Sequence, residues 1–151
     1  MKKIKEIAIA IIIPNVIGFL GSLIGNPSAF DNIIKPSFTP PKIVFPIVWV
    51  ILYTLMGISS YLIYKSNSNE KDESLFIYLI SLVLNSLWSF FFFKLKAFLF
   101  AFIWLILILI SVILFVIKFY KINKLSGLLQ IPYIIWLIFA GILNLSIYFL
   151  N

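Results

Sequence analysis

The chain of 151 residues is 63% hydrophobic and 18% aromatic, and only 11% of its residues are charged. Soluble domains are about half apolar and about a quarter charged, so this composition excludes a soluble globular protein, a disordered chain and a free-standing nucleic-acid-binding module. The sequence contains neither cysteine nor histidine, which removes disulfides, thiol nucleophiles and the commonest metal ligand. The net charge of +7 is the balance of twelve lysines and five acidic residues. In a membrane protein, the positions of the lysines indicate first which connections face the cytoplasm.

Five apolar segments follow one another along the chain, separated by short polar connections. They span residues 7–24, 43–64, 75–93, 97–117 and 128–150. Each has about 18–23 residues, which is enough for an α-helix to cross a bilayer core of about 30 Å. Because a lipid-exposed backbone must satisfy its own hydrogen bonds, the sequence predicts an all-α integral membrane protein with a single five-helix transmembrane domain over residues 1–151. Residues 25–42 form the longest connection.

The lysines are distributed unevenly between the two sides of this predicted bundle. Eight lie at the N-terminus and in the connections after the second and fourth segments, and four lie on the other side. The positive-inside rule therefore predicts that the N-terminus lies in the cytoplasm. The abundance of lysine, isoleucine and asparagine suggests an AT-rich bacterial genome. We therefore expect the protein to lie in a bacterial cytoplasmic membrane.

The acidic residues all lie near the N-terminus or in connections, and none lies deep in an apolar segment. Ion-coupled transport normally needs an ionisable group within the membrane, so this distribution argues against it. The sequence also shows no phosphate-binding loop, no Ser–His–Asp set and no cluster of metal ligands. It therefore offers no acid–base, nucleophilic or metal constellation for an enzyme.

The connection 25–42 contains three prolines within residues 36–41. Proline fixes its own φ and biases the preceding residue towards extended backbone, so this segment is stiff. It is either a lid over the outer end of the bundle or an ordinary connector that begins the second helix.

Aromatic and amide side chains recur at helical spacing on three of the predicted helices. These residues are Phe45, Trp49, Tyr53 and Met56 on the second, Asn85 and Trp88 on the third, and Tyr133, Trp136, Ala140 and Asn144 on the fifth. Buried asparagines need polar partners, so Asn85 and Asn144 are expected to face protein or a cavity rather than lipid. These faces indicate either a ligand pocket or plain core packing.

Small residues on the first helix and a proline on the fifth affect helix packing. Gly21 and Gly25 form a GxxxG element, which favours close approach to another helix, within the chain or across a dimer. Pro132 is expected to kink the fifth helix.

Three blocks of sequence are similar to one known family. Residues 35–41 (KPSFTPP), followed by Phe45-Pro46, Trp49 and Leu52-Tyr53, resemble the signature of the translocator protein family, also called tryptophan-rich sensory proteins (TspO). Later blocks agree: Leu84-Asn85 with Trp88 and Phe92-Phe93, and Pro132-Tyr133 with Trp136, Ala140 and Leu143-Asn144. The resemblance covers nearly the whole chain. It implies a five-helix bundle, often a homodimer, with a pocket under the loop between the first two helices.

The resemblance implies a membrane receptor or sensor that binds tetrapyrroles, protoporphyrin IX or haem, and related hydrophobic ligands. The implied role is porphyrin transport, sequestration or regulation. Carried over by position, the ligand-binding residues are Phe30, Pro40, Trp49, Tyr53, Asn85, Trp88, Trp136, Ala140 and Asn144. Trp49 and Trp136 match tryptophans implicated in light-dependent porphyrin breakdown in bacterial relatives, so porphyrin degradation is one alternative. A lipid-binding regulatory membrane partner is another.

The residues themselves fit a flat aromatic ligand, because tryptophan and tyrosine faces stack on such rings. Lys35 and Lys42 lie at the predicted mouth, where they either pair with porphyrin propionates or are ordinary loop charges. Without histidine, strong axial ligation of haem iron is not expected, so metal-free protoporphyrin is the preferred ligand. We expect no metal site, no obligatory cofactor and no nucleic-acid partner. Tyr148 is not followed by Lys or Arg, which argues against sterol recognition through a C-terminal motif.

Overall fold

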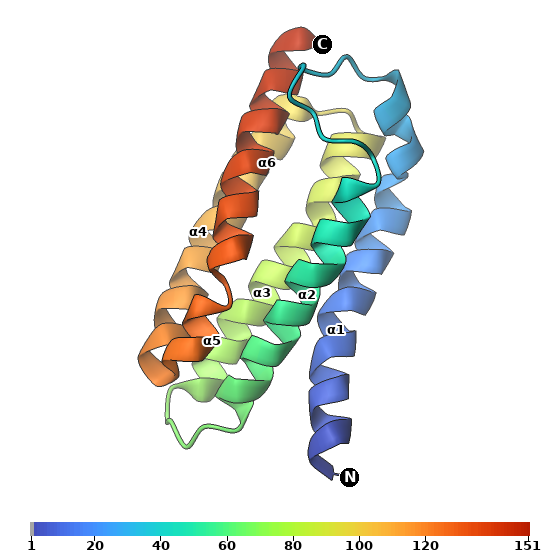
Figure 1. Cartoon of the computed structure of the whole chain (residues 1–151). Helices are drawn as coiled ribbons and strands as arrows, with labels where there is room; N and C mark the ends of the chain where they lie inside the picture. Colours follow the sequence, from blue (N-terminus) through green and yellow to red (C-terminus); the bar gives the residue numbers. More distant parts are fainter. Residues whose placement is uncertain (1) are drawn as a thin grey trace.

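The computed structural model describes residues 2–151 as a bundle of helices that run side by side (Figure 1). Its main helices are α1 (Lys2–Gly25), α2 (Val44–Tyr64), α3 (Lys71–Ser89), α4 (Phe98–Ile122), α5 (Lys124–Leu128) and α6 (Ile131–Leu150). A 3-10 helix, η1 (Pro27–Asn32), follows α1, and a π-helical turn, η2 (Phe90–Lys94), continues α3. Within the described residues, five spans are long and apolar enough to cross a membrane. This confirms the all-α membrane architecture predicted from the sequence.

Helices α1, α3 and α4 extend beyond one or both ends of their apolar segments. α1 already begins at Lys2, because lysine and glutamate are good helix formers even where they are not apolar. α4 continues to Ile122, five residues beyond the predicted end at 117, and carries Lys121 in its last turn. A lysine near a helix C-terminus interacts favourably with the helix dipole, so these charged turns remain helical.

The predicted fifth helix, 128–150, is interrupted near its beginning. α5 ends at Leu128, and α6 begins at Ile131 with Pro132 in its first turn. Proline has no N–H to continue the ladder of α5, but it is well tolerated in the first turn of a new helix. The fully buried Gln130 lies in the break and donates a hydrogen bond of 3.2 Å to the carbonyl oxygen of Leu55. The expected kink at Pro132 is therefore a complete break.

The helices form a ring that is closed on most sides. α1 contacts both α2 and α3, α4 contacts α3 and α6, and α5 contacts α2. The backbones of α2 and α6 hardly touch. Side chains, among them Phe45 and Trp136, bridge the gap between these two helices towards the connection of residues 26–43, which we call the lid.

Glycine contacts fix α1 against a different neighbour at each end. Gly21 lies against the backbone of Ser86 in α3, where an added Cβ would be 2.9 Å away. Gly25 likewise contacts Ser89, so the half of α1 nearer the lid packs against α3. The small-residue face therefore serves packing within the chain.

The half of α1 nearer the N-terminus packs against α2 instead. Gly57 of α2 lies against α1, where a Cβ on Gly57 would be 2.4 Å from the Cα of Ile11. Only a glycine permits this approach without a shift of the backbone.

The two ends of the bundle differ in charge and in connections. The connection between α2 and α3 lies at the same end as the N-terminus, and the lid lies at the opposite end (Figure 1). Ion pairs tie the first end together: Glu6 contacts Lys65, and Glu73 lies 3.0 Å from Lys118. Hydrogen bonding to the Glu6 carboxylate raises the pKa of Lys65. The cytoplasmic placement of the N-terminus stays a prediction.

Substitution of Gly57 by alanine tests the close contact between α1 and α2. We expect Gly57→Ala to lower the free energy of unfolding by about 1–3 kcal/mol, because the backbone of α1 must move to admit the methyl group. Gly141→Ala is the matched control, since its Cβ would find its nearest neighbour at 3.5 Å, an ordinary contact. Thermal unfolding in detergent compares the two variants. Equal losses would show that the spacing at Gly57 is not limiting.

Candidate ligand-binding site

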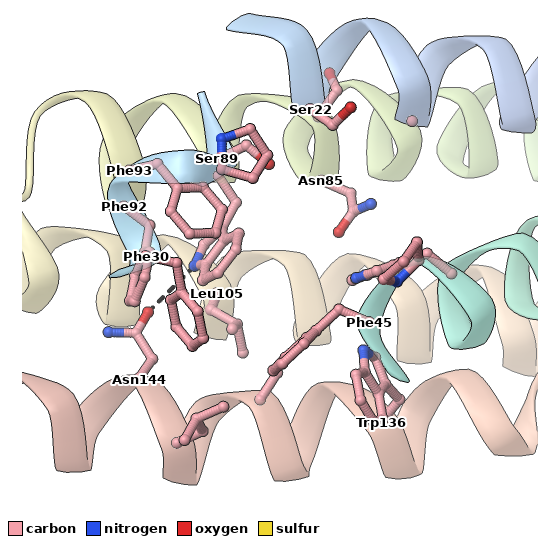
Figure 2. Close-up of a pocket in the computed structure, with 18 of the residues that line it drawn as sticks. Ser22, Phe30, Phe45, Asn85, Ser89, Phe92, Phe93, Leu105, Trp136 and Asn144 are labelled. Atoms are coloured by element: carbon pink, nitrogen blue, oxygen red, sulfur yellow. Dashed lines mark hydrogen bonds between the residues drawn. The ribbon is translucent and has the colours of Figure 1, made fainter. Parts of the chain in front are cut away.

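A cavity of about 600 Å³ lies inside the lid half of the bundle. Helices α1, α2, α3, α4 and α6 form its walls, and η1 covers it. Figure 2 shows Asn85 from α3 and Trp136 from α6 pointing from opposite sides towards a common space. Small-molecule sites have volumes of about 300–1,000 Å³, so this cavity is large enough for a sizeable organic ligand.

The structure brings together all but one of the predicted ligand-binding residues around this cavity. The lining includes Phe30, Trp49, Tyr53, Asn85, Trp88, Trp136, Ala140 and Asn144, and Lys42 lies at its mouth. Residues from four separate segments therefore converge on a single space. Their convergence follows from helical spacing, which turns one face of each helix inward.

Pro40 is the exception, because the proline-rich segment lies outside the lining. Residues 36–39 form a turn in which the N–H and the hydroxyl of Thr39 both bond to the carbonyl oxygen of Pro36, at 3.1 and 2.7 Å. Phe38 in this turn packs edge-to-face against Phe139 of α6, with ring centroids 6.4 Å apart. The turn thus rests against α6, and η1 provides the cover of the cavity instead.

Lys35 also lies outside the cavity lining, contrary to its predicted place at the mouth. Its ammonium group donates to the carbonyl oxygens of Phe30 and Ile33 at 2.8 and 3.1 Å. The same group lies 4.9 Å from the centre of the Phe30 ring. Lys35 therefore holds the backbone of the lid and is not positioned to pair with a ligand carboxylate.

Lys42 does line the mouth, where it forms an ion pair with Asp31. Both side chains are more than half exposed, at 54% and 58%. Asp31 has no signal in the sequence, because a single acidic residue in a connection does not differ from ordinary loop charge. Only the folding of η1 brings it within reach of Lys42.

Aromatic side chains form a continuous wall that joins the lid to three helices. Phe30 of η1 lies at its centre and contacts Phe93 of η2 and Phe45 of α2, with centroid distances of 6.1 and 5.6 Å. Phe93 contacts Trp88 at 5.8 Å, and Phe45 contacts Trp136 at 6.0 Å. All four contacts are edge-to-face, a favourable geometry for aromatic pairs. The buried Phe30 therefore couples the position of the lid to both tryptophans.

Asparagine side chains satisfy the polar groups of the wall. Asn144 accepts a hydrogen bond of 3.2 Å from the indole N–H of Trp88 and donates one of 2.8 Å to the carbonyl oxygen of Phe98. It thereby ties α6 to α3 and to the beginning of α4. Both asparagines singled out in the sequence have protein partners, as expected for buried amides.

Asn85 has one polar atom left for a ligand. Its amide nitrogen donates a hydrogen bond of 2.8 Å to the hydroxyl of Tyr53. Its carbonyl oxygen makes no hydrogen bond with any residue in the part of the chain that the structure describes. Because Asn85 lines the cavity, this oxygen is an acceptor available to a bound molecule.

The aromatic faces form a pocket at one depth of the bundle and a packed core at another. Trp49 and Tyr53 line the cavity, whereas Met56, one turn deeper on the same face, is fully buried in the core. On the other side, Trp136 lines the cavity and Tyr133 is buried in the core. The same helical face therefore serves as pocket wall near the lid and as packing surface below it.

Helices α1 and α4 also contribute to the lining, which their sequences did not predict. Asn15, Gly18, Phe19 and Ser22 of α1 line the cavity, as do Leu105 and Ile108 of α4. Both helices are apolar on nearly every side, so their pattern does not show which face turns inward. In α1, only the spacing of the glycines predicted a contact, and that prediction concerned helix packing and not the cavity.

Comparison with known proteins identifies the family of this sequence. The sequence profile of the TspO/MBR family matches residues 10–150. The chain belongs to the TspO/MBR family. It is 32% identical to the "Tryptophan-rich protein TspO" of Chlorobaculum tepidum, over 99% of this chain and 98% of that protein. It is 35% identical to the "Tryptophan-rich protein TspO" of Archaeoglobus fulgidus, over 98% of both chains.

A mammalian protein shows the same likeness. The chain is 29% identical to the "Translocator protein" of Bos taurus, over 88% of this chain and 82% of that protein. The resemblance noted in the sequence is thereby confirmed. The protein is a multi-pass membrane protein of the TspO/MBR family, whose relatives are named as sensory and translocator proteins.

Removal of the Asn144 side chain tests whether this residue organises the site. We expect Asn144→Ala to lower the free energy of unfolding by about 1 kcal/mol, the scale of an interhelical hydrogen bond in a membrane protein. Ser146→Ala is the matched control, because its hydroxyl bonds only to the carbonyl oxygen of Ile142 in its own helix. Thermal unfolding in detergent measures both. A larger loss for Ser146→Ala would contradict the assignment.

Proposed function

We propose that the cavity binds a flat, membrane-dissolved tetrapyrrole, such as protoporphyrin IX or haem, and that this TspO/MBR protein senses, sequesters or moves it. The observation that carries the proposal is the aromatic wall of the cavity, in which three tryptophans face one space under a lid. Flat conjugated rings are the ligands that gain most from stacking on such a wall. Related hydrophobic molecules of similar shape fit the same argument.

The charges at the mouth suit a ligand with carboxylate groups. Lys42 is the cationic residue in the cavity lining, and Asp31 is its present partner. A porphyrin propionate would replace Asp31 as the partner of Lys42. The pair is more than half exposed, so this exchange takes place in contact with water and costs little desolvation.

The residues of the chain favour a metal-free ring. The sequence has no histidine or cysteine, and Met56 is fully buried in the core below the cavity. The Tyr53 hydroxyl faces the cavity but already accepts the hydrogen bond from Asn85. We therefore expect haem to bind through ring contacts alone. A bis-ligated low-spin spectrum of reduced haem with the purified protein would contradict this.

Two further parts of the proposal rest on the family resemblance and on charge. The first is assembly into a homodimer. The second is residence in a bacterial cytoplasmic membrane with the N-terminus inside, supported by the excess of lysine at that end of the bundle.

Titration with protoporphyrin IX tests the proposal. We expect saturable binding to the detergent-purified protein, followed by the porphyrin absorption band, and weaker binding to Trp49→Phe and Trp136→Phe. Trp104→Phe is the matched control, because the indole of Trp104 bonds to the carbonyl oxygen of Leu84 and does not line the cavity. Linear uptake, unchanged by any of the three substitutions, would mean that the porphyrin only partitions into detergent.

A second prediction concerns the ion pair at the mouth. Asp31→Asn frees Lys42, so its affinity for protoporphyrin IX should rise several-fold, while its affinity for the uncharged dimethyl ester should not change. Lys42→Gln should weaken the binding of the acid and spare the ester. Parallel titrations with the two ligands measure this difference. Equal effects on acid and ester would remove the propionate contact from the proposal.

Light-dependent porphyrin breakdown is the second candidate function. It is favoured by the placement of Trp49 and Trp136 in the lining of the same cavity, and by the stacking of Trp49 on Tyr53 at 5.3 Å. The described residues offer no acid–base set, so the illuminated ring would supply the excited state and dissolved dioxygen the oxidant. Loss of turnover with retained binding in the double Trp→Phe variant would support this activity.

A lipid-binding regulatory role is the third candidate function. Titrations with protoporphyrin IX in the presence of lipid distinguish it from the first two. In that case lipid would fill the cavity, and porphyrin would not compete with it. Competition between lipid and protoporphyrin at one saturable site excludes this role as the main one.

A further inference from the structure

The residues that line the cavity are exposed at two places. One is the mouth under the lid, where Asp31 and Lys42 lie. The other lies on the sides of α1 and α2, where Phe19 is 62% exposed and Val50 is 57% exposed. The lining residues from α3, α4 and α6 are all buried or half-buried. The cavity therefore meets the lipid-facing surface between α1 and α2.

The packing of α1 explains this side opening. In the half nearer the N-terminus, α1 lies against Gly57 of α2. In the half nearer the lid, Gly21 and Gly25 hold α1 against α3. The ring of Tyr53 packs against Gly18, where an added Cβ would meet the ring, and so joins α2 to α1 below the opening. Nearer the lid, Phe19 and Ser22 of α1 and Pro46 and Val50 of α2 line the cavity.

Among residues 2–151, no side-chain hydrogen bond or ion pair crosses the opening between α1 and α2. The hydroxyl of Ser22 bonds to the carbonyl oxygen of Phe19 in its own helix. The ion pair that links α1 to the end of α2, Glu6 with Lys65, lies at the opposite end of the bundle. Side chains can therefore move apart here without loss of a hydrogen bond.

The other boundaries of the cavity are held more firmly. Between α2 and α6, the Phe45–Trp136 contact at 6.0 Å closes the gap. The lid is fixed by Lys35 and by Asn151, whose side chain bonds to both the N–H and the carbonyl oxygen of Ile34, at 3.0 and 2.9 Å. Opening the lid breaks these contacts, whereas widening the gap between α1 and α2 breaks none of them.

We propose that the gap bordered by Phe19 and Ser22 of α1 and by Pro46 and Val50 of α2 is a lateral portal. Through it, a hydrophobic ligand passes between the lid half of the membrane and the cavity while the lid stays closed. This inference rests on the proposed binding role of the cavity and adds the route. A ligand dissolved in lipid reaches the site without crossing the aqueous surface.

Labelling of a cysteine inside the cavity tests the portal without a porphyrin. Since the sequence has no cysteine, Ala140→Cys places a single thiol in the cavity wall formed by α6. The protein is reconstituted into phosphatidylcholine vesicles and treated with an apolar pyrene maleimide dissolved in the bilayer. Val50→Phe narrows the opening, and Val50→Ala widens it. Ile51→Phe is the matched control, since Ile51 is 54% exposed on the same helix and does not line the cavity.

We expect the Ala140→Cys thiol to react with the lipid-dissolved reagent, several-fold more slowly with Val50→Phe and faster with Val50→Ala. Ile51→Phe should leave the rate unchanged. No reaction from the bilayer, or equal rates for Val50→Phe and Ile51→Phe, would overturn the portal. Because Val50→Ala must accelerate labelling, a folding defect in Val50→Phe cannot imitate the expected pattern. Failure of porphyrin titration would leave these rates interpretable, so the two proposals can fail separately.

Discussion

Close contacts of small residues and hydrogen bonds between helices hold this bundle together, because lipid supplies no hydrophobic force that brings apolar helices into contact. In this chain such contacts lie around the ring of helices and at the end of the bundle opposite the lid. Gly21 and Gly25 place α1 on α3, Gly57 places α2 on α1, and the hydroxyls of Ser59 and Ser126 meet at 2.8 Å between α2 and α5. Because α2 and α6 lack such a contact near the lid, the ring stays open inside, and a cavity remains where a core would otherwise form.

The side chains that line this space combine stability with recognition. Aromatic rings from η1, η2, α2 and α6 contact one another edge-to-face, and Asn144 satisfies the indole N–H of Trp88. These contacts hold the side chains of the wall in place, and a preorganised wall lowers the entropic cost of binding. Phe30 belongs to both lid and wall, so a ligand that displaces its ring also changes the contacts of the lid. This link between occupancy and lid is the structural basis on which a sensor could work.

The sequence was sufficient for the spans, for the inward faces of α2, α3 and α6, and for most lining residues, because apolar length and helical spacing are local properties. It was insufficient wherever the outcome depended on tertiary contacts. Pro40 and Lys35 lie in the correct connection, but a turn at residues 36–39 and the carbonyl groups of η1 direct them away from the cavity. Asp31 and the lining residues of α1 lacked any distinguishing pattern. The break before Pro132 depended on Gln130 finding a partner on another helix.

The position of the bound porphyrin can be read from the shift of each tryptophan indole signal in ¹⁵N–¹H NMR spectra as protoporphyrin IX is added. The chain has four tryptophans, and Trp49, Trp88 and Trp136 line the cavity while Trp104 does not. Ring-current shifts fall steeply with distance, so the signals report contact with the macrocycle. Our account predicts large, saturable shifts for the three lining tryptophans and a small one for Trp104. Equal shifts for all four, or the largest for Trp104, would place the porphyrin outside the cavity and contradict it.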